Sequence, residues 1–248
     1  MRYMGSKSRI AKYVVPILQN IIDSNEITTY VEPFCGGCNI IDKIRCDSKI
    51  ANDKQHYLIE LFRNIEKVRT LPDEISKEHY SDVRASFYNK DLAYEDWYIG
   101  AIGFLASYNG RFFDGGYGAF ITRKSNGRTY NAYKEAKDNL LSQDLNRTAF
   151  ISGDYKDLVV PEGSLVYCDP PYEGTKQYGI NKNFNHKEFW NWVRKQAGSS
   201  IIIVSEEKAP DDFECIWEQE VQRSMNKDNK YNKVEKLFIP CKKEIIKL

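Results

Sequence analysis

The sequence lacks a hydrophobic run long enough to cross a membrane. A transmembrane helix needs about 20 consecutive apolar residues, whereas the longest run of β-branched residues is Ile201–Val204. The amino-terminal segment MRYMGSKSRI is basic but has no apolar core of the kind found in signal peptides. We therefore expect a cytoplasmic protein that has no membrane as a partner.

Histidine is scarce, and the cysteines show no disulfide framework. The 3 histidines are scattered, and the 6 cysteines follow no framework spacing, so an unexported protein should keep them as free thiols. Cys35 and Cys38 form a C-x-x-C pair, which could be a redox pair, half of a zinc site or a chance feature of a glycine turn. No second such pair completes a four-ligand zinc site, so we expect no metal.

A strong excess of one charge is also absent. The 36 lysines and arginines are balanced by 35 acidic residues, which gives a net charge of +1. The charges are nevertheless segregated, because residues 206–220 are acidic and the chain from Arg223 onward is rich in lysine. Such segregation indicates either a local anionic partner, for example nucleic acid, or a solvated lysine-rich edge.

The order of hydrophobic patterns predicts an α/β fold. The chain has 248 residues, of which 42% are hydrophobic, as in a globular protein of one large domain with room for an insertion. Strands that alternate with helices imply parallel βαβ units with right-handed crossovers. We expect strands at residues 28–34, 48–53, 148–154, 164–169 and 199–205, helices at 55–69 and 186–197, and an antiparallel hairpin from 215–221 and 234–240.

The alternation stops in the middle of the chain. Residues 70–147 show helical patterns at 77–89, 94–107 and 132–143 but no convincing strand. Between these patterns lies an aromatic, glycine-rich stretch at 108–131, and a loop of this length usually binds something. We expect a sheet domain made of residues 1–55 and 147–248, interrupted by a mainly helical recognition subdomain at 56–146.

The stretch YCDPPY at residues 167–172 carries the most specific chemistry. Proline fixes its own φ and pushes the preceding residue into an extended conformation, so Asp169 and Pro170 are both kept out of helical geometry. The Asp169 carboxylate and the Pro170 carbonyl can accept the two N–H bonds of an exocyclic amine, while the Tyr172 ring stacks on the base. The plainer interpretation is a rigid turn after a buried strand.

Asp169-Pro170-Pro171-Tyr172 matches the catalytic tetrapeptide of amino-group DNA methyltransferases, and the chain resembles the Dam-like DNA adenine-N6 branch nearly from end to end. The resemblance implies a Rossmann-like, S-adenosylmethionine-dependent methyltransferase sheet with a helical DNA-recognition insertion. It also implies methyl transfer to N6 of an adenine flipped out of double-stranded DNA. Asp169, Pro170 and Tyr172 would be the catalytic residues.

The resemblance also implies a set of residues that bind S-adenosylmethionine. RYMGSKSRI, VEPFCGGCNI, IANDKQHYLI and GDYKDL are similar to the family's cofactor segments. Glycines at the turn would let the backbone approach the cofactor, although Cys38 stands where the family commonly has a second alternate glycine. Besides Asp169, the cofactor-binding residues would be Tyr3, Lys7, Glu32, Pro33, Phe34, Gly36, Gly37, Asp53 (for the ribose), Asp154 and Tyr155.

The expected DNA-binding residues fall in two places. SYNGRF at 107–112 resembles the family's recognition segment, with Arg111 one residue earlier than usual, and the aromatics Tyr108, Phe112, Phe113, Tyr117 and Phe120 could face either DNA or the core. Arginines read guanine edges, whereas lysines more often contact phosphates. The predicted contacts are Tyr108, Asn109, Arg111, Arg123, Lys124 and Arg128 in the insertion, and Lys227 and Lys230 in the basic hairpin.

Other interpretations predict different substrates or no reaction. A methyltransferase for cytosine N4 or for adenine in RNA would suit the same tetrapeptide, since both present an NH₂ group on a ring. A non-catalytic DNA-binding or redox module would bind no S-adenosylmethionine. The sequence leaves open the recognition sequence, a cognate restriction endonuclease as partner, and the choice between monomer and dimer.

Overall fold

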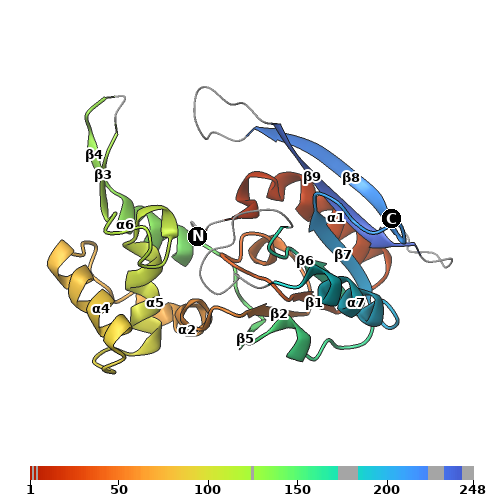
Figure 1. Ribbon diagram of the computed structural model, residues 1–248, viewed down its shortest axis with the longest axis horizontal. Coiled ribbons are helices and arrows are strands. Elements are labelled where there is room, and N and C mark those ends of the chain that lie inside the picture. Colours follow the sequence, from red (N-terminus) through yellow and green to blue (C-terminus); the bar gives the residue numbers. More distant parts are fainter. Residues whose placement is uncertain (2, 4, 124–125, 173–183, 223–231, 242–248) are drawn as a thin grey trace.

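The computed structural model describes the chain except for residues 2, 4, 124–125, 173–183, 223–231 and 242–248. Its centre is a 7-stranded sheet with the order β5-β2-β1-β6-β7-β9-β8 (Figure 1). Strands β5, β2, β1, β6 and β7 are parallel, and β9 runs antiparallel to both β7 and β8. The predicted α/β fold class is therefore confirmed, as is the final antiparallel hairpin. The strands are β1 (Thr29–Glu32), β2 (Ser48–Asp53), β5 (Thr148–Ser152), β6 (Leu165–Cys168), β7 (Ile201–Glu206), β8 (Phe213–Gln222) and β9 (Asn232–Pro240).

Alternating side chains of the central strands fill a separate core on each face of the sheet. Strand β6 is buried along its whole length, as expected of an apolar run in the middle of a parallel sheet. Its residues Leu165 and Tyr167 pack in a core with helix α1 (Ala11–Ser24). Val166 and Cys168 pack on the other face with helix α7 (His186–Gln196). Burial on both sides fixes the register of β6, and with it the position of Asp169.

The segment between β2 and β5 is mainly helical and lies to one side of the sheet (Figure 1). It contains α2 (His56–Arg63), α3 (Ile65–Val68), α4 (Lys77–Asn89), α5 (Asp96–Leu105) and α6 (Ala132–Leu141). Helix α2 contacts both α5 and the sheet strands β2 and β5, and one hydrophobic core includes residues of the sheet and of these helices. The boundaries of a separate recognition subdomain at 56–146 remain a prediction.

Three local expectations differ from the structure. Residues 108–131 contain a short antiparallel hairpin, β3 (Phe120–Thr122) and β4 (Thr129–Asn131), where no strand was expected. The helix expected at 55–69 is interrupted at Asn64, which separates α2 from α3. The apolar pattern of Ile40, Ile41 and Ile44 predicts a helix after the glycine turn, but the structure has only the short 3₁₀ helix η2 (Ile41–Lys43) there. The other 3₁₀ helices of the described chain are η1 (Lys7–Arg9), η3 (Tyr108–Gly110) and η4 (Tyr155–Asp157).

The mismatch in the loop has a physical reason. Only three residues on each side of the hairpin pair, which is too short for an alternating pattern to stand out from the surrounding polar residues.

Within the described parts of the chain, the helices are all too short or too polar to span a bilayer.

Candidate active site

Four acidic residues that were predicted to bind the cofactor or to act in catalysis stand at or just after the ends of four neighbouring parallel strands. Glu32 ends β1, Asp53 ends β2, Asp154 follows β5, and Asp169 follows β6. The carboxyl ends of parallel strands meet at one edge of a sheet, which is where open α/β sheets bind their ligands. The parallel registers of β5, β2, β1 and β6 place these four residues at that edge.

The turn after β1 is tied directly to the end of β2. The backbone N–H of Cys35 donates to the carbonyl oxygen of Asn52 at 2.8 Å, and that of Gly36 donates to Oδ2 of Asp53 at 3.0 Å. Gly36 has φ +46° and Cys38 has φ +55°. Cys38 therefore adopts the left-handed conformation for which glycine is usually preferred, and the turn is kept despite the departure from the family pattern.

The thiols of the C-x-x-C pair are buried and hard to ionise. Cys35 and Cys38 are buried free thiols, and burial raises the pKa of both. A reactive cysteine needs an accessible, easily formed thiolate. Among the residues that the structure describes, no cluster of histidine, cysteine and acidic side chains could hold a metal ion.

Met1 and Tyr3 lie across the glycine turn. The Met1 ammonium donates to Oδ1 of Asn39 at 2.9 Å, and Nδ2 of Asn39 donates to the carbonyl oxygen of Met1 at 3.0 Å. The Tyr3 ring packs on the turn so closely that a Cβ on Gly36 would lie 3.0 Å from its Cε1 atom. The absence of a side chain at Gly36 thus makes room for Tyr3, a protein neighbour that the sequence did not indicate.

Two of the carboxyl groups at this edge are perturbed by burial. Burial raises the pKa of Glu32 to about 8, although the Tyr30 hydroxyl donates to its Oε1 atom at 2.8 Å. Burial also raises the pKa of Asp53, against the opposing effect of hydrogen bonds from the backbone N–H groups of Gln55 and Gly36. Such shifts concentrate at functional sites.

An aromatic cluster lies beside the predicted cofactor residues Phe34 and Tyr155. Their ring centroids are 5.1 Å apart, and both rings contact Phe184 and Phe189. The side chain of Asn52 joins the two segments that lead to Phe34 and Tyr155. Its Nδ2 atom donates to the carbonyl oxygens of Pro33 and Gly153 at 2.9 and 3.1 Å. Its buried Oδ1 atom has no hydrogen-bond partner among the described residues, so the site retains one unused acceptor.

Lys7 lies against the Asp-Pro-Pro-Tyr tetrapeptide at residues 169–172. Its Nζ atom is 3.1 Å from Oδ1 of Asp169, 4.3 Å from the centroid of the Tyr172 ring, and within hydrogen-bonding distance of the Tyr172 hydroxyl. Asp169 keeps a side-chain exposure of 20%, whereas Pro170 and Tyr172 are buried. The corner therefore reaches the surface through Asp169 and Pro171.

Glu235 and Ser205 complete this corner, and sequence reasoning did not identify either of them. Glu235 Oε2 accepts from Lys7 Nζ at 2.9 Å and from the Tyr172 hydroxyl at 2.7 Å, and Ser205 Oγ lies 2.9 Å from the same hydroxyl. One signal was present in the sequence, because Glu235 alternates with Leu237 and Ile239 on the buried face of β9. An acid at an inward position of a strand is uncommon without a partner.

The aromatic residues of the insertion, which could face either DNA or the core, are divided between the two. Tyr108 is 47% exposed and Phe120 is 40% exposed, whereas Phe113 is buried. Phe112 and Tyr117 pack partly buried against the core. Asn109, next to Tyr108, is also exposed, and its φ is +55°.

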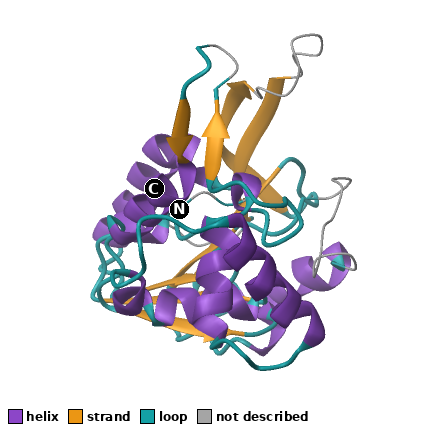
Figure 2. Ribbon diagram, turned by 90° about the vertical axis from the view of Figure 1, so that its left-hand side faces the viewer, coloured by secondary structure: helices purple, strands orange, loops and turns teal. Residues whose placement is uncertain are grey.

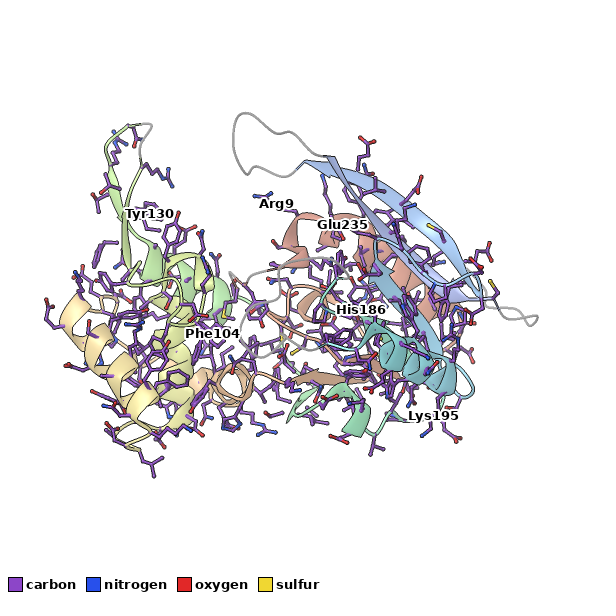
Figure 3. All side chains as sticks on the ribbon, in the orientation of Figure 1. Arg9, Phe104, Tyr130, His186, Lys195 and Glu235 are labelled. Atoms are coloured by element: carbon purple, nitrogen blue, oxygen red, sulfur yellow. The ribbon has the colours of Figure 1, made fainter. Side chains whose placement is uncertain are left out.

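Two hairpins extend from the same side of the molecule, as Figures 1 and 2 show from two directions. Arg123 and Arg128 lie at the end of hairpin β3–β4, where the Arg123 guanidinium is 4.8 Å from the centroid of the Tyr130 ring. Figure 3 shows Tyr130 on this hairpin and Glu235 on hairpin β8–β9, with Arg9 between them in this view. Lys124, Lys227 and Lys230 lie outside the described residues.

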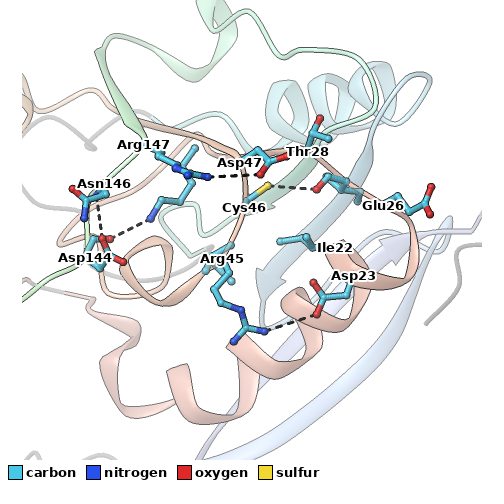
Figure 4. Close-up of a pocket in the computed structure, with 13 residues that line it drawn as sticks. Ile22, Asp23, Glu26, Thr28, Arg45, Cys46, Asp47, Asp144, Asn146 and Arg147 are labelled. Atoms are coloured by element: carbon cyan, nitrogen blue, oxygen red, sulfur yellow. Dashed lines mark hydrogen bonds and ion pairs between the residues drawn. The ribbon is translucent and has the colours of Figure 1, made fainter.

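A hollow of about 670 Å³ lies elsewhere, at the opposite edge of the sheet (Figure 4). Thr28, Asp47 and Arg147 line it, and they directly precede β1, β2 and β5. Asp47 and Arg147 are both mostly exposed and are 3.7 Å apart. The hollow contains none of the predicted site residues, so it does not form part of the candidate active site.

The comparisons with known proteins show the family of this chain. The sequence model of the D12 class N6 adenine-specific DNA methyltransferases matches residues 3–202. The type II methyltransferase M.MjaIII of Methanocaldococcus jannaschii is 25% identical over 197 residues, which cover 70% of this chain and 68% of that protein. The type II methyltransferase M.FokI of Planomicrobium okeanokoites is 23% identical over 233 residues, covering 82% of this chain but only 33% of M.FokI.

Solved structures show more distant similarity. The rRNA methyltransferase AviRa of Streptomyces viridochromogenes aligns with a TM-score of 0.43 and 11% identity, covering 95% of this chain and 85% of that one. A dimethyladenosine transferase of Plasmodium falciparum aligns with a TM-score of 0.37 and 14% identity, covering 91% and 61%. The family match spans most of the chain and includes the glycine turn and the Asp-Pro-Pro-Tyr corner, and the chain therefore belongs to the D12 class N6 adenine-specific DNA methyltransferases.

Proposed function

We propose that this protein binds double-stranded DNA, takes one adenine out of the helix and methylates its N6 atom, with Asp169, Pro170 and Tyr172 as the catalytic residues. The observation that carries the proposal is the position of Asp169. It follows a fully buried strand, its carboxylate reaches the surface, and it shares one edge of the sheet with the glycine turn. Both curated relatives are named type II methyltransferases, so we include a separate cognate endonuclease in the proposal.

The residues at the strand ends fit S-adenosylmethionine, the methyl donor that membership of this family implies. Asp53 offers a carboxylate at the end of β2, where nucleotide-binding α/β proteins hold ribose hydroxyls. Phe34 and Tyr155 offer an aromatic surface for the adenine ring, and Asn52 Oδ1 offers a buried acceptor. The carboxylate of Asp169 supplies negative charge for a cationic ligand.

The chemistry of the transfer needs an activated methyl group, which bound S-adenosylmethionine supplies. The amine of adenine is a weak nucleophile because its lone pair is delocalised into the ring. When the Asp169 carboxylate and the Pro170 carbonyl accept its N–H bonds, the lone pair is freed to point at the methyl group. Alignment of this kind can contribute about 7–11 kcal/mol toward lowering a barrier. As the C–N bond forms, the methyl group would leave the sulfur of the donor, which would keep the electron pair of the S–C bond as a neutral thioether, and N6 would lose one proton toward the Asp169 carboxylate.

The flipped base needs a surface to replace the stacking that it loses. Stacking on an aromatic ring is worth roughly 1–3 kcal/mol per base, and Tyr172 is the ring next to Asp169. Tyr172 is 7% exposed, so a base that stacks on it has to displace the groups that cover the ring. The exposed side chains of Tyr108 and Asn109 are proposed to enter the gap in the helix.

The two hairpins are proposed to hold the DNA from opposite sides of the flipped base. Arg123 and Arg128 on hairpin β3–β4, with Lys124 and with Arg111 in the preceding turn, would approach the base edges. Lys227 and Lys230 would contact phosphates from the second hairpin. Supporting this arrangement, both hairpins lie on the same side of the molecule (Figure 2).

The test is a methylation assay with labelled S-adenosylmethionine and a mixture of DNA duplexes, followed by mass spectrometry of the digested product. N6-methyladenine is the expected product, and N4-methylcytosine would contradict the proposal.

Asp169→Ala should lower the single-turnover rate by on the order of 10²- to 10³-fold while DNA affinity changes little. Asp211→Ala, at an exposed position between β7 and β8, is the matched control and should retain the wild-type rate.

A further inference from the structure

A cluster of buried polar side chains lies directly behind Asp169, and each member comes from a different element. Lys7 lies on η1, Tyr172 follows β6, Ser205 lies on β7, and Glu235 lies on β9. Lys7 is 9% exposed, Tyr172 7%, Ser205 0% and Glu235 8%. Side chains this deeply buried persist only when their charges and hydrogen bonds are satisfied by one another.

One ammonium in this cluster serves two carboxylates. Lys7 Nζ is 2.9 Å from Oε2 of Glu235 and 3.1 Å from Oδ1 of Asp169, and it also donates to the Tyr172 hydroxyl. These three partners account for the three N–H bonds of an ammonium group. Burial by itself would lower the pKa of Lys7, but Asp169 and Glu235 outweigh it and raise the pKa, so the ammonium stays charged.

Lys7 donates one of its N–H bonds to Glu235, so this part of the ammonium charge is directed away from Asp169. A carboxylate that is fully paired with an ammonium is a weaker acceptor for the amine of a base than one that shares the ammonium with a second carboxylate. Glu235 Oε2 also accepts from the Tyr172 hydroxyl at 2.7 Å. Glu235 thus contacts both the Lys7 ammonium, which pairs with Asp169, and the hydroxyl of Tyr172, three positions after Asp169.

We infer that Glu235 is a positioning residue for methyl transfer, which acts by drawing the Lys7 ammonium and the Tyr172 hydroxyl toward β9 and so preserves Asp169 as a strong acceptor. This inference rests on the proposed function of Asp169. The position of Glu235 is fixed on both sides, because β9 pairs with β7 through Val204↔Phe238 and with β8 through Gln219↔Glu235. Glu235 therefore ties the arm formed by β8 and β9 to the catalytic corner.

The test is the variant Glu235→Gln, which removes the negative charge but keeps the size of the side chain and one acceptor oxygen. In Glu235→Gln the ammonium should turn to Asp169, and the single-turnover rate should fall about 10-fold or more, since a hydrogen bond to a charged group is lost. The KM values for DNA and S-adenosylmethionine should change by less than about threefold, because no substrate contact is removed. The matched control is Glu218→Gln on β8, an exposed acid paired with Lys236 at 3.1 Å, which should behave as wild type.

A double variant shows whether Glu235 acts through Lys7. In a Lys7→Met background the additional change Glu235→Gln should cause little further loss of rate, because the shared ammonium is already absent. Independent, multiplicative losses would overturn the inference, as would a Glu235→Gln enzyme whose rate equals that of Glu218→Gln.

If Glu235→Gln does not fold, Ser205→Ala tests the same cluster, and an unchanged rate in that variant would overturn the inference. A wild-type enzyme that transfers no methyl group to DNA would instead reject the proposed function itself.

Discussion

The Asp53 carboxylate holds the backbone of Gly36 in place. Its Oδ2 atom accepts the Gly36 N–H at 3.0 Å, and its Oδ1 atom accepts the Gln55 N–H at 2.9 Å. Asp53 was expected to act only as a ligand of the cofactor's ribose. The structure adds a second role, because the same carboxylate joins the end of β2 to the turn after β1, and carboxylates retain further lone pairs after two such bonds.

Replacing this carboxylate with an amide should weaken cofactor binding. In Asp53→Asn an NH₂ group faces one of the two backbone N–H groups, so one hydrogen bond is lost and one donor is left unpaired. We expect the Kd for S-adenosylmethionine to rise about 10-fold or more, as measured by isothermal titration calorimetry. Asp47→Asn is the control, because Asp47 precedes the same strand at its other end and is 79% exposed. Equal affinities of the two variants would exclude Asp53 from the cofactor site.

The pH dependence of stability should report the buried carboxyl of Glu32. Its pKa is raised on folding from the ordinary 4.5 to about 8, so the folded state binds this proton more tightly than the unfolded state does. The resulting stabilisation is present at low pH and is lost as the pH rises from about 4.5 to about 8. Each pKa unit corresponds to 1.36 kcal/mol, which gives a loss of roughly 3–5 kcal/mol.

Glu32→Gln removes this titration while keeping an acceptor for the Tyr30 hydroxyl. Relative to wild type, the variant should therefore gain free energy of unfolding as the pH is raised from 5 to 9, by roughly 3–5 kcal/mol. Urea unfolding at several pH values measures the difference, and comparison at each pH cancels the groups that both proteins share. Parallel pH profiles would show that Glu32 has an ordinary pKa in the folded protein.

Much of the fold was predictable because its signals are local. The strand ending at Cys168 is a continuous apolar run followed by Asp-Pro-Pro, and proline stiffness restricts the backbone in any context. The glycine turn and the acid at the end of the next strand are also visible as short patterns. The structure confirms that both lie at the same edge of the sheet as Asp169.

Other features depend on contacts between distant parts of the chain. Lys7 and Glu235 are 228 positions apart, and their pairing depends on how η1 and β9 meet. Whether Phe113 is core and Tyr108 is exposed follows from the path of the loop, which the two residue types do not reveal. The left-handed backbone of Cys38 was unexpected because cysteine has no intrinsic preference for that conformation.

Gly118 should be required for DNA binding even though it carries no side chain. A Cβ on Gly118 would lie 2.5 Å from Cα and 2.6 Å from N of Tyr108, so Gly118→Ala must displace the turn that presents Tyr108 and Asn109. We expect weaker binding to target DNA and an unchanged Kd for S-adenosylmethionine. Tyr108→Ala removes the exposed ring without the steric conflict and should show the same selective loss. Wild-type DNA affinity in both variants would show that this turn does not face DNA.

Base reading and phosphate binding should separate between the turn before β3, which carries Arg111, and the segment that joins β8 to β9. Alanine at Lys227 or Lys230 should weaken binding to all sequences alike and should reduce the slope of log K against log salt by about 0.9 for each phosphate that the protein no longer neutralises. Arg111→Ala should instead relax sequence choice, because a bidentate hydrogen bond to a base is worth about 1–3 kcal/mol of discrimination. Fluorescence anisotropy over a salt series measures the first effect, and sequencing of methylated sites in a random library measures the second.

The control for both measurements is Lys195→Ala, because Lys195 is an exposed lysine of α7 that lies away from the two hairpins (Figure 3). It removes the same charge from the protein, so a general effect of net charge would appear in this variant too. A smaller salt slope in Arg111→Ala together with altered sequence choice in Lys227→Ala would reverse the two assignments. In that case the hairpin β8–β9 would read the bases, and the turn before β3 would position the backbone.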